Sequence, residues 1–272
     1  MSLISLAVIF LLSVSAFAHV HVQIGFAGGD WDLHVFDLEY GRSDAREYTV
    51  PVSLSARNTI PNDAAYTNFL GGGGNPIWIL PQEERAGILY LGLGTIGFTR
   101  GMFSGDQIKL SLHRVDGPGN FAMYTLSPFG EPIVHMTSLD DVNPTNDFIK
   151  LPAISGHLHV NWAFSAPGLY KISFKASGIL RGSGHLSESS IVDYTFWVDG
   201  GALRFSSPRM RPGGTFVFNL ESAPNAVCRI EDTFDFQEWN SILTITNSTG
   251  LMEVELIHSS VKPARYIRAV TD

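Results

Sequence analysis

Short runs of alternating apolar and polar residues extend along most of this chain, separated by clusters of Gly, Pro, Asn and Asp. Helical periodicity, in which apolar residues recur three and four positions apart, is almost absent. This pattern is typical of an all-β protein. We therefore predict an antiparallel β-sandwich in the larger, N-terminal part of the chain. Its strands are expected at 19–25, 31–37, 88–91, 107–115, 121–126, 157–164, 169–176 and 191–198.

The sequence also predicts a division into two β domains. Gly200 and Gly201 follow the last aromatic strand of the sandwich, so we place the boundary there, between a domain at 19–199 and a small β-sandwich-like module at 203–272. Residues 57–76, which include four successive glycines, are expected to form a long surface loop. Strands of the C-terminal module are expected at 214–219, 226–231, 241–246, 252–257 and 265–270.

Residues 1–18 have the pattern of an export signal. An apolar run is followed by Ala16 and Ala18, the small-x-small arrangement that signal peptidase cleaves. The run is shorter than the roughly 20 residues that a membrane-spanning helix needs. We expect cleavage after Ala18, a secreted, periplasmic or cell-surface location, and no membrane insertion afterwards.

Charge and cysteine content narrow the choice of partners. The formal net charge is −8, which argues against nucleic acid, because that partner calls for clustered Lys and Arg. Cys228 is the single cysteine of the chain, so no intrachain disulfide can form.

Two His-x-His tripeptides carry the main functional signal, with His19 and His21 in the first and His157 and His159 in the second. Alternate residues of a strand face the same side, so the two imidazoles of each pair project together, with Cα atoms about 6.6–7 Å apart. One ion can take two ligands from a strand at that spacing. Neutral imidazole suits transition metals, and we predict a zinc or copper site.

A third segment offers further ligands. His34 shares a strand face with Asp32, and we predict that His34 joins the metal site and that Asp32 binds the metal directly or orients a ligand. Asn161 is expected on the same face as His157 and His159, with a bulge just after it. The sequence does not show whether the three segments meet. The alternative therefore stays open that these histidines are structural residues on half-exposed strands.

Two other patterns suggest different functions. Cleavage after Ala18 would make His19 the mature N-terminus, whose α-amine, with a reference pKa of about 7.7–8, could help to chelate copper in a copper enzyme. Aromatic residues could instead line a sugar-binding platform, in which case the protein would be a surface adhesion or glycan-binding module; the candidates include four of the five tryptophans, Trp31, Trp78, Trp162 and Trp197.

The glycine-rich stretch at 92–97 matches the G-x-G-x-x-G pattern of dinucleotide-binding proteins. That pattern binds a pyrophosphate only where a helix begins directly after it. No helical pattern follows here, so we interpret the stretch as glycine-rich β structure.

The segment at 157–170 resembles the H-x-H-x-x-W-x-F-x-x-P-G-x-Y motif of the choice-of-anchor M domain, a relative of the actinobacterial surface-anchored repeat. The residues that carry this resemblance are His157, His159, Trp162, Phe164, Pro167, Gly168 and Tyr170. The stretches 19–37, 88–97 and 115–119 also fit the domain, so the resemblance covers roughly residues 19–199.

The resemblance implies an exported, non-catalytic domain that accompanies ABC transporters of the metal-uptake type. The chain departs from the family in lacking a sorting tail, which puts surface anchoring in doubt. Residues 203–272 instead resemble a β module that ends secreted proteins of Verrucomicrobia-like bacteria, through 228–231, 238–240 and 266–270. Together, these features favour a cell-envelope protein that binds a transition metal, with a metal-type transporter or a surface component as its partner.

Overall fold

The computed structural model describes residues 19–200, 203–212, 214–222, 226–234, 237–257 and 266–271. Of these residues, 60% lie in strands and 6% in helices, which confirms the predicted all-β fold. The expected export signal at 1–18 lies outside the described residues. Within the described part of the chain, no helix has both the length and the apolar character needed to cross a bilayer.

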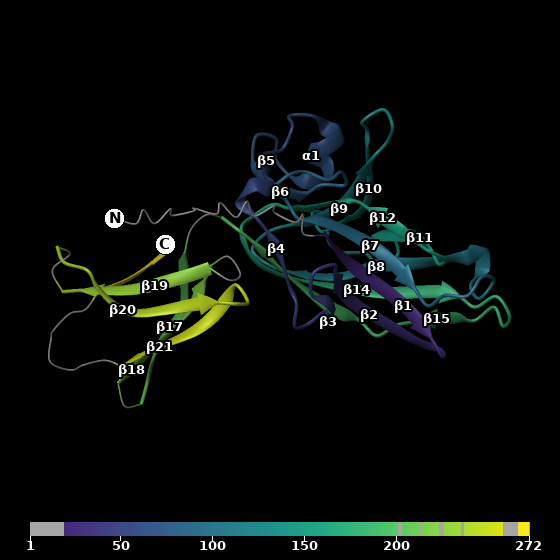
Figure 1. The fold of residues 1–272 in the computed structure, drawn as a ribbon. Helices are drawn as coiled ribbons and strands as arrows, with labels where there is room; N and C mark the ends of the chain where they lie inside the picture. Colours follow the sequence, from purple (N-terminus) through teal and green to yellow (C-terminus); the bar gives the residue numbers. More distant parts are fainter. Residues whose placement is uncertain are drawn as a thin grey trace, which may run out of the picture.

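Three sheets build residues 19–198 (Figure 1). Sheet A has the spatial order β12 (His157–His159), β7 (Tyr90–Ile96), β1 (His19–Ala27), β2 (Asp30–Asp37), β3 (Gly41–Asp44). Sheet B has the order β11 (Phe148–Pro152), β8 (Gln107–Asp116), β14 (Gly168–Ile179), β16 (Val192–Val198), β4 (Thr49–Val52), and β15 (Leu186–Glu188) pairs with β14. Sheet C has the order β10 (Pro132–Thr137), β9 (Phe121–Leu126), β13 (Asn161–Phe164), β6 (Pro76–Leu80), β5 (Arg57–Thr59).

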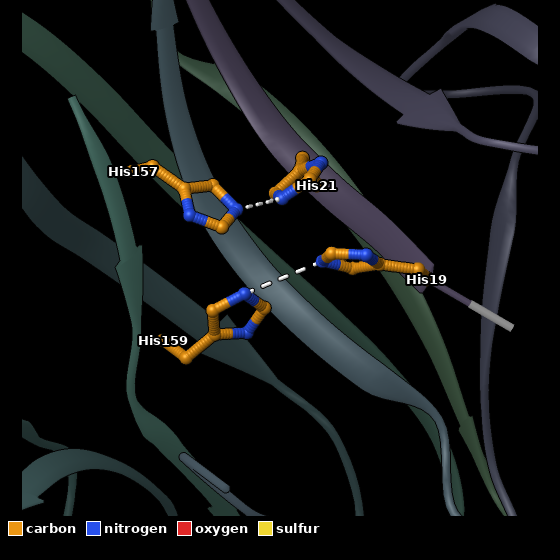
Figure 2. A group of neighbouring side chains, drawn as sticks. All are labelled: His19, His21, His157 and His159. Atoms are coloured by element: carbon orange, nitrogen blue, oxygen red, sulfur yellow. Dashed lines mark hydrogen bonds between the residues drawn. The ribbon is translucent and has the colours of Figure 1, made fainter. Parts of the chain in front are cut away.

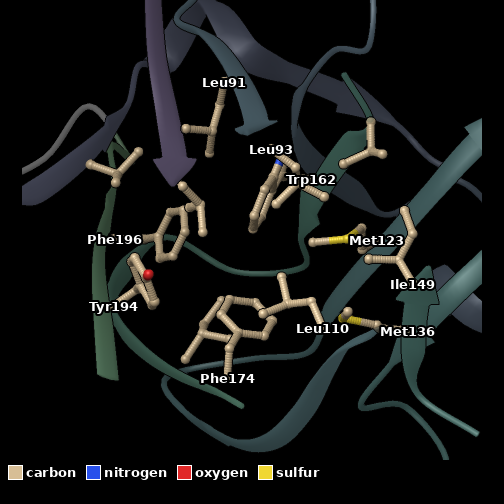
Figure 3. Close-up of a cluster of buried hydrophobic side chains, with 14 of the residues drawn as sticks. Leu91, Leu93, Leu110, Met123, Met136, Ile149, Trp162, Phe174, Tyr194 and Phe196 are labelled. Atoms are coloured by element: carbon tan, nitrogen blue, oxygen red, sulfur yellow. The ribbon is translucent and has the colours of Figure 1, made fainter. Parts of the chain in front are cut away.

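The three sheets enclose one apolar core (Figure 3). Val20 and Val22 enter it from β1, Phe174 and Phe196 from sheet B, and Trp162 from sheet C, and none of the five retains exposed surface. Side chains alternate between the two faces of a strand. Because the valines of β1 point into the core, the histidines beside them point away from it, onto the outer face of sheet A.

The loop predicted at 57–76 contains regular structure, so that prediction was wrong. It holds β5, the helix α1 (Ala64–Leu70) and the start of β6, with short 3₁₀ turns η1 (Leu54–Ala56) and η2 (Ser104–Asp106) elsewhere. Asp63 caps α1 by accepting a hydrogen bond from the backbone N–H of Ala65 at 2.9 Å. Phe69 and Leu70 then pack on the outer face of sheet C in a small second cluster. A seven-residue helix is too short to show the periodicity that reveals longer ones.

Two further expectations about the strands need correction. The strand predicted at 157–164 is divided at Val160: β12 pairs with β7 in sheet A, whereas β13 belongs to sheet C. A switch between sheets therefore stands where a bulge was expected, as happens at the corner of a sandwich. The sandwich is also not wholly antiparallel, because β1 pairs parallel to β7 and β16 parallel to β4.

The C-terminal strands form two three-stranded sheets. One has the order β17 (Arg204–Arg211), β18 (Thr215–Glu221), β21 (Leu251–Ile257), and the other β20 (Asn240–Asn247), β19 (Ala226–Thr233), β22 (Tyr266–Thr271). They share a separate apolar cluster that includes Phe218, Leu220 and the free thiol of Cys228. The domain boundary at Gly200 and Gly201 stays a prediction, and Gly201 lies outside the described residues.

Candidate metal centre

The two His-x-His tripeptides lie on strands that flank a single strand, β7. His19 and His21 belong to β1, His157 and His159 to β12, and β7 runs between them in sheet A. Both His21 and His159 pair with Gly92 of β7. Paired residues of neighbouring strands face the same side of a sheet, so all four imidazoles rise from the outer face. The sequence predicted each pair correctly and left open whether the pairs meet; the structure brings them together.

The four imidazoles converge closely enough to share one ion (Figure 2). Each offers one nitrogen to a group in which all ligand atoms lie within 4.8 Å of one another. The Nε2 atoms of His21 and His157 are 2.7 Å apart, and those of His19 and His159 are 3.3 Å apart. These contacts join residues 136 and 140 positions apart in the sequence. The residues can therefore hold a transition-metal ion of the kind that imidazole favours.

Glycine in β7 makes this convergence possible. A Cβ atom at Gly92 would lie 2.6 Å from Cδ2 of His21 and 2.9 Å from Cε1 of His159. Real Cβ contacts are not that short, so any side chain here would push both rings aside. Glycine inside a strand often marks a position that other groups approach closely. The glycine-rich stretch thus forms strand structure over 92–96, as predicted, and its Gly92 is the floor of the candidate site.

Burial and mutual repulsion lower the pKa of three of the four histidines, His19, His21 and His159. Burial lowers the pKa of His21 to about 4, and the other three imidazoles add to the effect. Burial, followed by repulsion from His157 and His19, lowers the pKa of His159 to about 4, although the backbone of Leu91 acts in the opposite direction. The pKa of His19 is also lowered, mainly by burial. Near neutral pH these three rings are therefore neutral, so each can offer a nitrogen lone pair to a metal ion without first losing a proton.

Tyr90 packs against the imidazole of His159. It was not identified from the sequence as part of the site. Its ring stacks on His159 with centroids 3.6 Å apart and planes within 3° of parallel. It also lies 5.1 Å from the ring of His19, its pairing partner on β1. Alternation along the strand could have identified Tyr90, because it precedes Gly92 by two residues and therefore lies on the same face.

His34 and Asp32 share the outer face of sheet A but lie outside the group of converging nitrogens. His34 pairs with Gln23, which lies two residues along β1 from His21. Its Nδ1 is 3.2 Å from Oδ2 of Asp32, whose Oδ1 accepts a hydrogen bond of 2.7 Å from Arg42. Asp32 is thus engaged with Arg42 and His34, and a role of either predicted residue in metal binding stays a prediction. Asn161, expected beside the histidines, lies in sheet C and donates to Gln82.

Two alternative functions were predicted from the sequence, an N-terminal copper chelate and a sugar-binding platform. An N-terminal copper chelate requires cleavage after Ala18, which lies outside the described residues. A sugar platform is not supported by the predicted tryptophans: Trp162, Trp78 and Trp197 are buried, and Trp31 packs against the core. The three buried rings cannot stack on a sugar, so that part of the prediction was wrong, whereas Trp31 is partly buried.

The chain matches no protein-family model, and a comparison with curated proteins found no match. The resemblance to the choice-of-anchor M domain accordingly stays a prediction. Fold and site together define an all-β protein with a four-histidine group that can hold a metal ion.

Proposed function

We propose that this protein binds one zinc or copper ion through His19, His21, His157 and His159, and captures or delivers that metal at the cell envelope. The observation that carries the proposal is the convergence of four nitrogens from two strands over a glycine. Four ligands placed by backbone pairing need little rearrangement on binding, which lowers the entropic cost of forming the site.

The chemistry of the four ligand atoms limits which metal ions can bind. All four donors are imidazole nitrogens, and the group contains no carboxylate or thiolate. Hard cations such as calcium and magnesium prefer oxygen ligands, whereas imidazole suits zinc, copper and nickel. A non-catalytic capture or delivery function also agrees with the lowered pKa of three of the ligands, since the site is ready to bind at neutral pH.

The envelope location is also a proposal. It is supported by the apolar run and the small-x-small pattern at 1–18 and by the resemblance of residues 19–199 to an exported domain. That resemblance also supports a metal-type ABC transporter or a surface component as the partner. A processed N-terminus at His19 in protein recovered from the cell exterior would support export. Full-length protein retained in the cytosol would contradict it.

The decisive experiment is a metal titration of chain purified without an affinity tag. We expect one zinc or copper ion per chain for the wild type, measured by calorimetry and by elemental analysis after desalting. The double variant His157→Ala/His159→Ala should lose this binding. The control His113→Ala/His185→Ala removes two imidazoles elsewhere and should bind as the wild type does. Equal binding by the first variant and the wild type would overturn the proposal.

A further inference from the structure

All four ligands of the proposed metal centre come from one face of one sheet. Neighbouring strands lie about 4.7–4.9 Å apart, so β1 and β12 are separated by roughly 9.5 Å across β7, while the two histidines of each strand are about 6.6–7 Å apart. The two pairs are offset by two residues, because His21 and His159 both pair with Gly92, whereas His19 pairs with Tyr90 and His157 with Gly94. The four backbone positions therefore form a parallelogram centred on Gly92.

The ring positions describe a flattened arrangement. Going around the group, neighbouring ring centroids are 4.5, 4.7, 4.8 and 5.1 Å apart. The two diagonals, His19 to His157 and His21 to His159, are both 5.9 Å. In a regular tetrahedron the diagonals would equal the sides, and in a flat square they would be about 1.4 times longer. The observed diagonals lie between these limits, so the four rings form a puckered ring rather than a closed cage.

A puckered ring leaves the ion open along the axis through its centre. On the sheet side this axis meets Gly92, which has no side chain to offer as a ligand. On the other side lies solvent at the His157 edge: the His157 side chain is exposed and those of His19 and His159 are half-buried, whereas His21 is 9% exposed. Metal sites that retain such a position keep a water or substrate there, unlike closed structural sites.

We infer that the metal held by these four histidines keeps one exchangeable coordination position on the outer side of sheet A, which takes water or a small anion. The inference rests on the proposed function and adds to it: a position open to an incoming ligand lets a metal pass to an acceptor by ligand exchange, without prior loss of a histidine.

The test uses the full chain loaded with one equivalent of Cu²⁺ and desalted, with azide as the probe. We expect azide to change the electron paramagnetic resonance and visible spectra of the copper in a saturable manner, with one azide per copper. Removal of azide by desalting should restore the first spectrum with the copper retained. The control His113→Ala/His185→Ala should respond as the wild type does.

The outcomes separate the two proposals. Stoichiometric copper with spectra that azide does not change means a closed site; it overturns the inference and leaves the proposed function standing. A chain that binds no copper, zinc or nickel overturns both. If azide strips the copper instead of binding to it, then the position is not exchangeable and the inference is wrong.

Discussion

Gly92 offers the sharpest perturbation of the candidate site, through the variant Gly92→Ala. The added methyl group would lie 2.6 Å from His21 and 2.9 Å from His159, whereas ordinary contacts begin at 3.4 Å. Relief of both clashes requires the rings to move by 3.4 − 2.6 = 0.8 Å and 3.4 − 2.9 = 0.5 Å. Metal–ligand distances tolerate only about 0.2 Å. Two of the four ligands would then be out of place at once.

The expected consequence is a metal affinity lower by about 10- to 100-fold, the range seen when groups that orient metal ligands are removed. The fold should survive, because Gly92 does not have positive φ and alanine in a strand costs less conformational entropy than glycine. Calorimetric titration with zinc or copper measures the affinity, and thermal unfolding of the metal-free chain measures the fold.

A matched control lies on the same strand and face. At Gly94, a Cβ atom would meet the amide end of Gln23 at 2.7 Å, which is the far end of a flexible side chain and can swing away. Gly94→Ala should therefore bind metal almost as the wild type does. If Gly92→Ala binds with unchanged affinity, or if both variants lose affinity equally, then Gly92 is not the floor of the site and the geometric argument fails.

Three further outcomes follow from the same structure. Tyr90→Leu removes the ring stacked on His159 and should weaken metal binding about 10-fold in calorimetry, whereas Tyr90→Phe keeps the stack and should bind as the wild type does; equal affinities for the two variants would contradict a positioning role. The pKa of His21 is about 4 in the folded chain against 6.5 when unperturbed, so the unfolded chain binds more protons between these values. The thermal midpoint of the metal-free protein should therefore fall as the pH is lowered from about 6.5 toward 4, and it should fall less in His21→Gln; parallel profiles would be evidence against the shift. Trp162→Ala empties a fully buried position and should cost about 3–5 kcal/mol in urea unfolding, while a loss below about 1 kcal/mol would contradict its place in the core.

Local alternation was enough to predict much of the site. The pattern around His19 and His21 showed that both imidazoles leave the strand on one side, and the same held for His157 and His159. The partners of each strand could not be predicted this way, because the contacts join residues 136 and 140 positions apart. Only the pairing of β1 and β12 with β7 decides that the two pairs meet.

The glycines of β7 were visible in the sequence, but their purpose was not. Gly92 and Gly94 alternate with Leu91 and Leu93, which predicts a strand with one apolar face and one bare face. The function of a strand face without side chains cannot be inferred until the residues on the neighbouring strands are known. For His34, the sequence correctly predicted a shared strand face with Asp32 but not its position in the sheet. The register places His34 beside Gln23, outside the converging group.

Short elements account for most of the fold that the sequence did not reveal. The strands β5 and β15 have three residues each, and β6 begins at Pro76, where a turn was expected. Segments this short carry too few alternations to stand out from loops. Their pairing with longer strands, rather than their own composition, makes them part of a sheet.

The central claim is that four imidazoles, two from β1 and two from β12, bind one ion. X-ray absorption spectroscopy of the zinc- or copper-loaded full chain tests this most directly, because it counts the imidazole ligands around the metal. The structure predicts four imidazole nitrogens at about 2.0–2.1 Å, with at most one additional light ligand. A first shell with two or fewer imidazoles, or one dominated by carboxylate oxygen, would contradict the claim.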